Sequence, residues 1–380
     1  MTATKSPARP QKDRDAGLRA LSHLQEARYL RVEPPILQPA SIFLDLSGEE
    51  IRGRLFLTSD ASGAELCLRP DYTIPVCRAY LDSAKPGALA QYCYLGPIFR
   101  SHVGQAAEAV QTGLESYGRD DAEAADAEII ALALEAAQAA GAGELNVRMG
   151  DVHLFDRVLH ALGLPDVWSR RLRRGLARGR PLESILGGAS AEPAAHSGVL
   201  AAMERADHAG ARALVEDLLA IAGITAVGGR SVGEIADRFL DSAALRAEAS
   251  APQEKRAILA QFLKISGEPD AASAKLRKLA KDAKLNIAAA LDSLDQRVGF
   301  LAARGVSLER CTFAAAFVRD IGYYTGCIFE GVESGHADAK PVLGGGRYDG
   351  LARRLGAGRD IPAVGAAVFL DRLHSAKERL

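Results

Sequence analysis

Apolar side chains recur at helical spacing in the first part of the chain. Residues 16–29 carry one at every third position, at Leu18, Leu21, Leu24 and Ala27. This period favours an amphipathic helix that ends before RVEPPILQP at 31–39, a proline-containing segment predicted to be extended. The residues before the helix are polar, so residues 1–15 are expected to form a disordered tail.

Short β-prone stretches separated by Gly, Pro and Asp follow between residues 55 and 100. The stretches are LFLTSD, ELCLRPDYTIPVCRAYL and AQYCYLGPIFR. They predict a sheet built largely of antiparallel strands rather than of repeated strand–helix–strand units. Residues 121–140 then predict a long helix, because they are rich in Ala, Leu and Glu and place acidic residues where the helix dipole favours them.

The middle of the chain has a different texture. From about residue 165 it is rich in Ala, Leu and Arg with few aromatic residues, and a β-like composition returns at Cys311. This pattern predicts an α+β fold in which a helical insertion, residues 165–285, divides one core into two segments, residues 16–164 and 286–380.

One stretch of the predicted insertion combines a buried stripe with many arginines. Trp168, Leu172 and Leu176 lie four residues apart, so they share one helix face. The arginines around them lie mostly off that face: Arg170, Arg171, Arg173, Arg174 and Arg178. A solvated cationic face is the simpler interpretation, since charge runs usually face water, and a partner-binding patch is the alternative.

Composition narrows the possible functions. The chain has 47 basic and 48 acidic residues, a net charge of −1, so it has no overall electrostatic footprint for nucleic acid. Its five cysteines are scattered without metal-ligand spacing, which predicts buried free thiols and no metal. No segment resembles a signal peptide or reaches the roughly 18 apolar residues of a membrane span, so a cytoplasmic protein without membrane association is expected.

Two segments place polar residues at strand spacing. In CLRPDYTIPVCR, Asp71 and Thr73 are two residues apart, so on a strand they share a face that suits an ammonium group. In the later segment Gln111, Gly113 and Glu115 alternate in the same way, and the glycine leaves room between the two polar side chains.

A third segment, FVRDIGYYTGCIFEG at 317–331, sets polar groups in an apolar run. If it forms a strand, Tyr324 and Gly326 share a face, and Arg319 lies just before the strand begins. A guanidinium for a carboxylate, acids for an ammonium and tyrosine hydroxyls for a polar side chain together indicate an amino-acid pocket. Each segment taken alone is better explained by a structural ion pair or by tyrosines in the core, because structural ion pairs are common.

The glycine-rich segment VLGGGRYDGL at 342–351 fits neither a phosphate-binding GxxxxGK[ST] loop nor a GxGxxG dinucleotide fingerprint. A tight glycine turn between a strand and a helix is expected instead. A last strand at 363–370 and a C-terminal helix from Asp371 are predicted to follow. The sequence has no HExxH or GxSxG motif, and no cofactor is expected.

Taken in order, these segments resemble the catalytic core of class II aminoacyl-tRNA synthetases, and within them histidyl-tRNA synthetase. RVEPPILQP is similar to the end of the first class II motif. The stretch from YLGPIFRSH to QTGLESYG resembles the second motif. The stretch from VLGGGRYDGL to PAVGAAVFLDRL resembles the third. FVRDIGYYTGCIFE is similar to the histidine-specific signature RGLDYYTGTVFE. The resemblance covers about residues 16–160 and 285–380, and it implies an antiparallel sheet flanked by helices.

The resemblance also implies roles for individual residues in holding free L-histidine. Contacts with the α-ammonium would come from Asp71, which is usually Glu in the synthetases, Thr73 and Gln111. Glu115 and Tyr324 would contact the imidazole. Tyr323 would line the pocket, and Arg319 would contact the carboxylate.

Departures from the synthetase pattern concern ATP and tRNA. The chain continues for only eight residues after Arg372, so no anticodon-binding domain and no tRNA partner are expected. The segment SHVGQAAEAV that follows Arg100 contains no Arg or Lys, although the synthetases carry arginine there. His102 replaces the usual Glu, and Gly322 the usual Asp. Arg100 and Arg372 are therefore expected to belong to a vestigial ATP site.

A histidyl-synthetase core of this length resembles the regulatory subunits of ATP phosphoribosyltransferase, the first enzyme of histidine biosynthesis. That resemblance implies a non-catalytic subunit that joins a short-form catalytic subunit and mediates feedback inhibition by L-histidine. It also implies self-association as a dimer through PPILQPASIFL at 34–44. The alternatives are a minimal histidine-adenylating enzyme or aminoacyl ligase, and a scaffold whose pocket groups merely pair with each other.

Overall fold

A computed structural model describes residues 9–373, except residues 48, 84, 102–105, 165, 320–321, 336–339 and most of 187–252, where only residues 217 and 221 are described. Within the described residues, no helix is long and apolar enough to cross a membrane.

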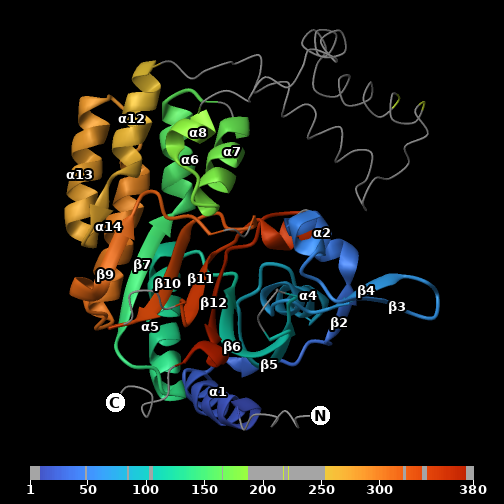
Figure 1. The fold of residues 1–380 in the computed structure, drawn as a ribbon. Coiled ribbons are helices and arrows are strands. Elements are labelled where there is room, and N and C mark those ends of the chain that lie inside the picture. The colour runs from blue at the N-terminus through green and yellow to red at the C-terminus, as the bar shows by residue number, and fades with distance from the viewer. Residues whose placement is uncertain are drawn as a thin grey trace, which may run out of the picture.

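A nine-stranded sheet forms the centre of the molecule, in the order β1-β5-β6-β12-β11-β10-β7-β9-β8 (Figure 1). Its strands are β1 (Leu30–Arg31), β5 (Ala90–Phe99), β6 (Glu108–Tyr117), β7 (Leu145–Asp151), β8 (Ser266–Gly267), β9 (Cys311–Ala314), β10 (Cys327–Glu333), β11 (Leu343–Arg347) and β12 (Ala363–Phe369). Only the β1–β5 and β7–β9 pairs are parallel. The prediction of a largely antiparallel sheet is thus confirmed.

Helices α1 (Arg9–Glu26) and α5 (Ala122–Ala140) pack together on one face of this sheet. Leu21 and Leu24 are buried there, as their spacing predicts, whereas Leu18 of the same predicted face is 46% exposed. The Arg19 guanidinium donates hydrogen bonds to two carbonyls at the end of α5, at 3.0 and 2.9 Å. Helix α1 begins at Arg9, so the expected boundary of a disordered tail at residue 15 falls inside a helix, and only residues 1–8 of that tail lie outside the described residues.

The opposite side carries α2 (Ala40–Ser47), α3 (Glu49–Arg52), α4 (Thr73–Ser83) and a small antiparallel sheet in the order β2-β4-β3. Its strands are β2 (Leu37–Pro39), β3 (Leu57–Ser59) and β4 (Glu65–Leu68). A second apolar core lies here and contains Phe43, Tyr80 and Tyr94. This core encloses the candidate site, because Tyr323, Tyr324 and Tyr348 belong to it as well.

The remaining helices stand beside the β7–β9 end of the sheet (Figure 1). They are α6 (Val152–Ala161), α7 (Asp166–Ala177), α8 (Leu182–Leu186), α12 (Gln253–Leu263), α13 (Pro269–Asp282) and α14 (Ala288–Ala303). Trp168 and Leu172 are buried, which confirms the predicted stripe. The predicted insertion also contributes β8, which pairs with β9, so it is not wholly helical. The middle of that insertion lies outside the described residues.

Three local predictions were wrong. Residues 73–83 form helix α4 and not a strand, and Asp71 precedes this helix. Gly344, Gly345 and Gly346 lie inside strand β11 rather than in a turn. The tyrosine pair at 323–324 forms a turn before β10, so it is not part of that strand. The last strand, β12, agrees with the prediction, whereas residues 374–380 of the expected C-terminal helix lie outside the described residues.

Candidate ligand-binding site

Glu115 is the centre of the candidate site. Its side chain is fully buried in the middle of β6. The Thr73 hydroxyl donates a 2.9 Å hydrogen bond to Glu115 Oε1, and the Tyr348 hydroxyl donates to Oε2. Gly365 faces it on the neighbouring strand β12, where a Cβ atom would lie 1.5 Å from Oε2. The glycine therefore makes room for the carboxyl group.

Burial dominates the ionisation of this carboxyl group and raises the pKa of Glu115 to about 8. The hydrogen bonds from Tyr348 and Thr73 oppose this rise in pKa, whereas the nearby Asp71 carboxylate adds to it. In the ligand-free protein near neutral pH, Glu115 is thus largely a neutral acid. A neutral acid both donates and accepts hydrogen bonds, as an imidazole also does.

Tyrosine rings wall the site around Glu115. The Tyr323 ring meets Tyr348 edge-on, with ring centroids 5.7 Å apart, and lies 5.0 Å from the Tyr324 ring. The Tyr348 hydroxyl lies 3.4 Å from that of Tyr117. The sequence analysis missed Tyr348 and Tyr117. Tyr348 directly follows the segment GGGR. The glycines of that segment were interpreted as a turn, and no role was predicted for the tyrosine.

The structure brings Asp71 and Thr73 to the site through a helix start instead of a strand. The Asp71 carboxylate accepts a 3.3 Å hydrogen bond from the backbone N–H of Ile74, in the first turn of α4. Carboxylates are favoured at this place because the first N–H groups of a helix have no partner within it. Burial raises the pKa of Asp71, and the positive charge of Arg100 opposes that rise.

Gln111 is buried and lies on the same face of β6 as Glu115, four residues before it. Its Oε1 atom has no hydrogen-bond partner within the described part of the chain. Because buried amide oxygens are nearly always paired, this atom suits a donor such as an ammonium group. Gln111 and Glu115 share one face of β6, and Thr73 contacts Glu115.

The Arg319 side chain crosses strand β11, which contains three glycines, to reach the site. Its Nη1 atom donates a 2.9 Å hydrogen bond to the Phe329 carbonyl, and its guanidinium lies 5.9 Å from the centre of the Tyr324 ring. A Cβ atom on Gly344 would lie 1.9 Å from Nη1, and one on Gly346 would lie 2.9 Å from the Tyr324 ring. The glycines of β11 thus provide the space for Arg319 and Tyr324.

Within the part of the chain that the structure describes, the hydrogen bonds of Arg100 and Arg372 go to backbone carbonyls, those of Pro70 at 2.6 Å and Pro341 at 2.9 Å. Burial lowers the pKa of Arg372, and the positive charges of Arg100 and Arg319 lower it further, against the opposing charge of Asp371. The three guanidiniums are therefore close enough to repel one another. Among the described residues, none of the three has a carboxylate within ion-pair distance, although Arg100 acts on Asp71 and Asp371 acts on Arg372 through their charges.

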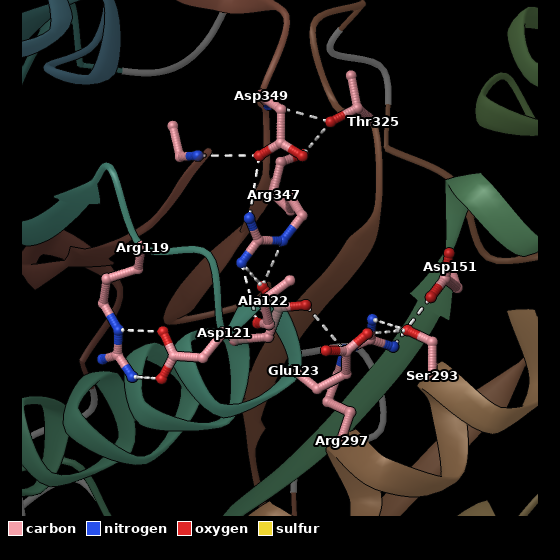
Figure 2. A network of polar contacts seen from close by, with 12 residues as sticks. Arg119, Asp121, Ala122, Glu123, Asp151, Ser293, Arg297, Thr325, Arg347 and Asp349 are labelled. Carbon is pink, nitrogen blue, oxygen red and sulfur yellow. Dashed lines mark hydrogen bonds and ion pairs between the residues drawn. The ribbon is translucent and has the colours of Figure 1, made fainter. Parts of the chain in front are cut away.

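A buried ionic network fixes the strand ends beneath the tyrosine turn (Figure 2). The Asp126 carboxylate lies between Arg297, at 2.8 Å, and Arg347, at 2.7 Å. Arg347 also holds Asp349 at 3.0 Å, and the Asp349 N–H donates a 3.0 Å hydrogen bond to the Thr325 hydroxyl. Figure 2 shows Arg297, Arg347, Asp349 and Thr325 of this network. Thr325 directly follows the tyrosine pair in the sequence.

Two solved structures share the fold of this chain. An ATP phosphoribosyltransferase regulatory subunit/histidyl-tRNA synthetase from Bacillus halodurans superposes with a TM-score of 0.65 at 22% identity, over 97% of this chain and 80% of that one. A histidyl-tRNA synthetase from Nostoc gives a TM-score of 0.64 at 16% identity, over 98% and 74% of the two chains. Fold and family model agree, because the model described as histidyl-tRNA synthetase matches residues 5–223 and 208–373. The protein thus has a class II, histidyl-tRNA-synthetase-like core.

Sequence relatives narrow this class further. A protein from Brucella anthropi named ATP phosphoribosyltransferase regulatory subunit is 39% identical over 365 residues, which cover 94% of this chain and 95% of the relative. One of the same name from Agrobacterium fabrum is 38% identical over 362 residues, with the same coverage. The chain belongs to the family of ATP phosphoribosyltransferase regulatory subunits.

Proposed function

We propose that this chain binds free L-histidine at the Glu115 site and makes an ATP phosphoribosyltransferase complex sensitive to histidine, without catalysing a reaction itself. One observation carries the proposal. A buried carboxyl group that accepts hydrogen bonds from Thr73 and Tyr348 lies in a tyrosine-walled site, and the Arg319 guanidinium lies 5.9 Å from the Tyr324 ring of that wall. Gln111 lies on the same face of β6 as this carboxyl group. This set offers one group for each polar part of histidine.

The charge of each side chain determines which group of histidine it suits. The guanidinium of Arg319 suits the α-carboxylate, and Asp71 with the unpaired Gln111 oxygen suits the α-ammonium. Glu115 and Tyr324 suit the two imidazole nitrogens. Each charge-assisted hydrogen bond in a closed site contributes about 1.5 to 3 kcal/mol, so the loss of one group is expected to be measurable.

Feedback control requires more than binding. Histidine must bind one state of the complex better than the other, and the coupling free energy is typically about 1 to 3 kcal/mol. The proposed partner is a short-form catalytic subunit, in keeping with the name of the relatives. Self-association as a dimer is proposed through residues 34–44, where Ile36 and Leu37 are 41% and 48% exposed.

Co-expression with a short-form ATP phosphoribosyltransferase tests this function. The two chains are expected to co-purify, and histidine is expected to inhibit the complex but not the catalytic subunit alone. Stable co-purification with activity that histidine does not change would contradict the regulatory role. Failure of the two chains to co-purify would contradict the proposal that the catalytic subunit is the partner.

A second candidate is suggested by Arg100, Arg319 and Arg372, which have no carboxylate partners among the described residues and lie close enough to affect one another. Such cations suit the phosphates of ATP, so a histidine-adenylating enzyme is the alternative. Exchange of pyrophosphate into ATP that depends on histidine would favour the alternative, and its absence would favour the regulatory subunit. A scaffold without a ligand would show neither exchange nor histidine binding.

A further inference from the structure

Helix α7, which lies in the predicted insertion, holds the backbone of the tyrosine pair. Arg173 of α7 donates a 3.0 Å hydrogen bond from Nη2 to the carbonyl oxygen of Tyr324, 151 residues further along the chain. Tyr324 is buried. Removal of Arg173 would leave the Tyr324 carbonyl oxygen without this charged donor.

Helix α7 holds Arg173 in a defined place. Trp168 and Leu172 are buried on its inner face. Gly175 allows α8 to pack closely, since a Cβ atom there would lie 2.5 Å from Ile185. Arg173 Nη1 also lies 3.5 Å from the Asp156 carboxylate on α6, which accepts a 2.5 Å hydrogen bond from Ser169.

The other anchors of the turn come from core elements. The Thr325 N–H donates to the Arg347 carbonyl at 2.8 Å, and the Val152 N–H donates to the Gly326 carbonyl at 2.9 Å. With the Tyr324 carbonyl held by Arg173, the peptide plane between residues 324 and 325 is fixed at both ends. Because peptide groups are planar, this fixes the direction in which the Tyr324 ring leaves the backbone.

We propose that Arg173 is a positioning residue of the ligand site, which orients Tyr324 and links histidine occupancy to helix α7. This inference rests on the proposed function for the identity of the ligand. The link itself does not require histidine. Whatever moves the tyrosine turn must either carry α7 with it or break the bond from Arg173.

Three variants test the proposal by calorimetric titration with L-histidine. Arg173→Ala is expected to weaken binding about tenfold, the loss expected for one hydrogen bond from a charged donor. Arg173→Gln keeps a donor and is expected to restore part of that loss. Arg174→Ala is the matched control, because Arg174 is exposed on the same helix and loses the same charge. Equal affinity of the Arg173→Ala and Arg174→Ala proteins would overturn the positioning role.

Trp168 reports on the link because it is the sole tryptophan of the chain and lies on α7. Histidine is expected to change its fluorescence in the wild type and in Arg174→Ala, and to change it much less in Arg173→Ala at saturation. A wild-type protein that binds histidine with unchanged Trp168 emission, or an equal change in all variants, would overturn the link.

Amide hydrogen exchange without ligand separates this inference from the proposed function. Residues 322–327 are expected to exchange faster in Arg173→Ala than in Arg174→Ala, while the two proteins melt at similar temperatures. Equal exchange would overturn the tether. Absence of histidine binding by a wild type that shows the exchange difference would instead overturn the proposed ligand.

Discussion

The Thr73 hydroxyl donates a 2.9 Å hydrogen bond to Glu115, although one residue begins helix α4 and the other lies in the middle of strand β6. With Tyr348 as second donor, both oxygens of the Glu115 carboxyl are held before any ligand arrives. The site is therefore preorganised around one acid. Preorganised groups lose little entropy on binding, which favours a selective site for a small ligand.

Glu115→Gln is expected to weaken histidine binding by about tenfold to a hundredfold and to relieve feedback inhibition, while the complex still assembles. The amide cannot accept hydrogen bonds at both of the atoms that now receive Tyr348 and Thr73. Titration calorimetry and inhibition assays on the co-purified complex measure the two effects. Unchanged inhibition would remove Glu115 from the ligand site.

The raised pKa of Glu115 predicts how stability depends on pH. The folded protein holds this proton up to about pH 8, whereas the ordinary value is 4.5, so the folded state binds more protons between these values. The stability of the wild type relative to Glu115→Gln must then fall as pH rises through that window. Urea denaturation of both proteins at several pH values measures this difference. Parallel stability profiles would contradict a buried acid with a raised pKa.

Tyr324→Phe is expected to weaken histidine binding by a smaller factor than Glu115→Gln, about threefold to tenfold, because only one hydroxyl is lost. The ring keeps its packing against Tyr323. Competition between histidine and an amino acid without an imidazole separates ring recognition from general binding. A similar loss for both ligands would show that Tyr324 does not recognise the imidazole.

Gly344→Ala is expected to displace the Arg319 guanidinium, since the added Cβ atom would lie 1.9 Å from Nη1. Arg319 is the proposed carboxylate partner, so histidine affinity should fall about tenfold while the protein still folds. Gly299→Ala is the control, because Gly299 lies exposed in α14 with nothing within 4 Å of the added atom. It should stabilise the helix by about 0.5 to 1 kcal/mol and leave binding unchanged.

Arg297→Met tests the buried network. It leaves Asp151 without its 2.9 Å partner and Asp126 with Arg347 alone, and the loss of one member of a buried pair costs about 3 to 5 kcal/mol. Arg277→Met is the surface control. Arg277 pairs with Asp292 and Asp295 in partly exposed positions, and the expected cost is below about 1 kcal/mol. Equal losses in chemical denaturation would show that burial does not distinguish the two arginines.

The elements that produce a periodic pattern of apolar residues were predicted from the sequence. The amphipathic helix at Leu21 and Leu24, the long helix α5, and the strand carrying Gln111 and Glu115 all lie where spacing indicated. The stripe of Trp168 and Leu172 is likewise buried.

Features that depend on tertiary contacts could not be predicted from the sequence. The start of α4 at Thr73 was misread because its β-branched residues favour a strand, although Asp71 before it and Pro75 in its first turn are both compatible with a helix start. Gly344 pairs with strands on both sides, and a glycine fits there because the Arg319 side chain crosses it; no local pattern records that crossing. Arg173 looked like one of many surface arginines, since its partner lies 151 residues away.

Titration of the purified protein with L-histidine and with L-histidinol, which lacks the carboxylate, tests the central claim most directly. Saturable binding of one histidine per chain, with histidinol at least about tenfold weaker because Arg319 loses its partner, is the predicted result. No saturable binding of histidine, or equal binding of both compounds, would contradict a site built from Glu115, the tyrosine pair and Arg319.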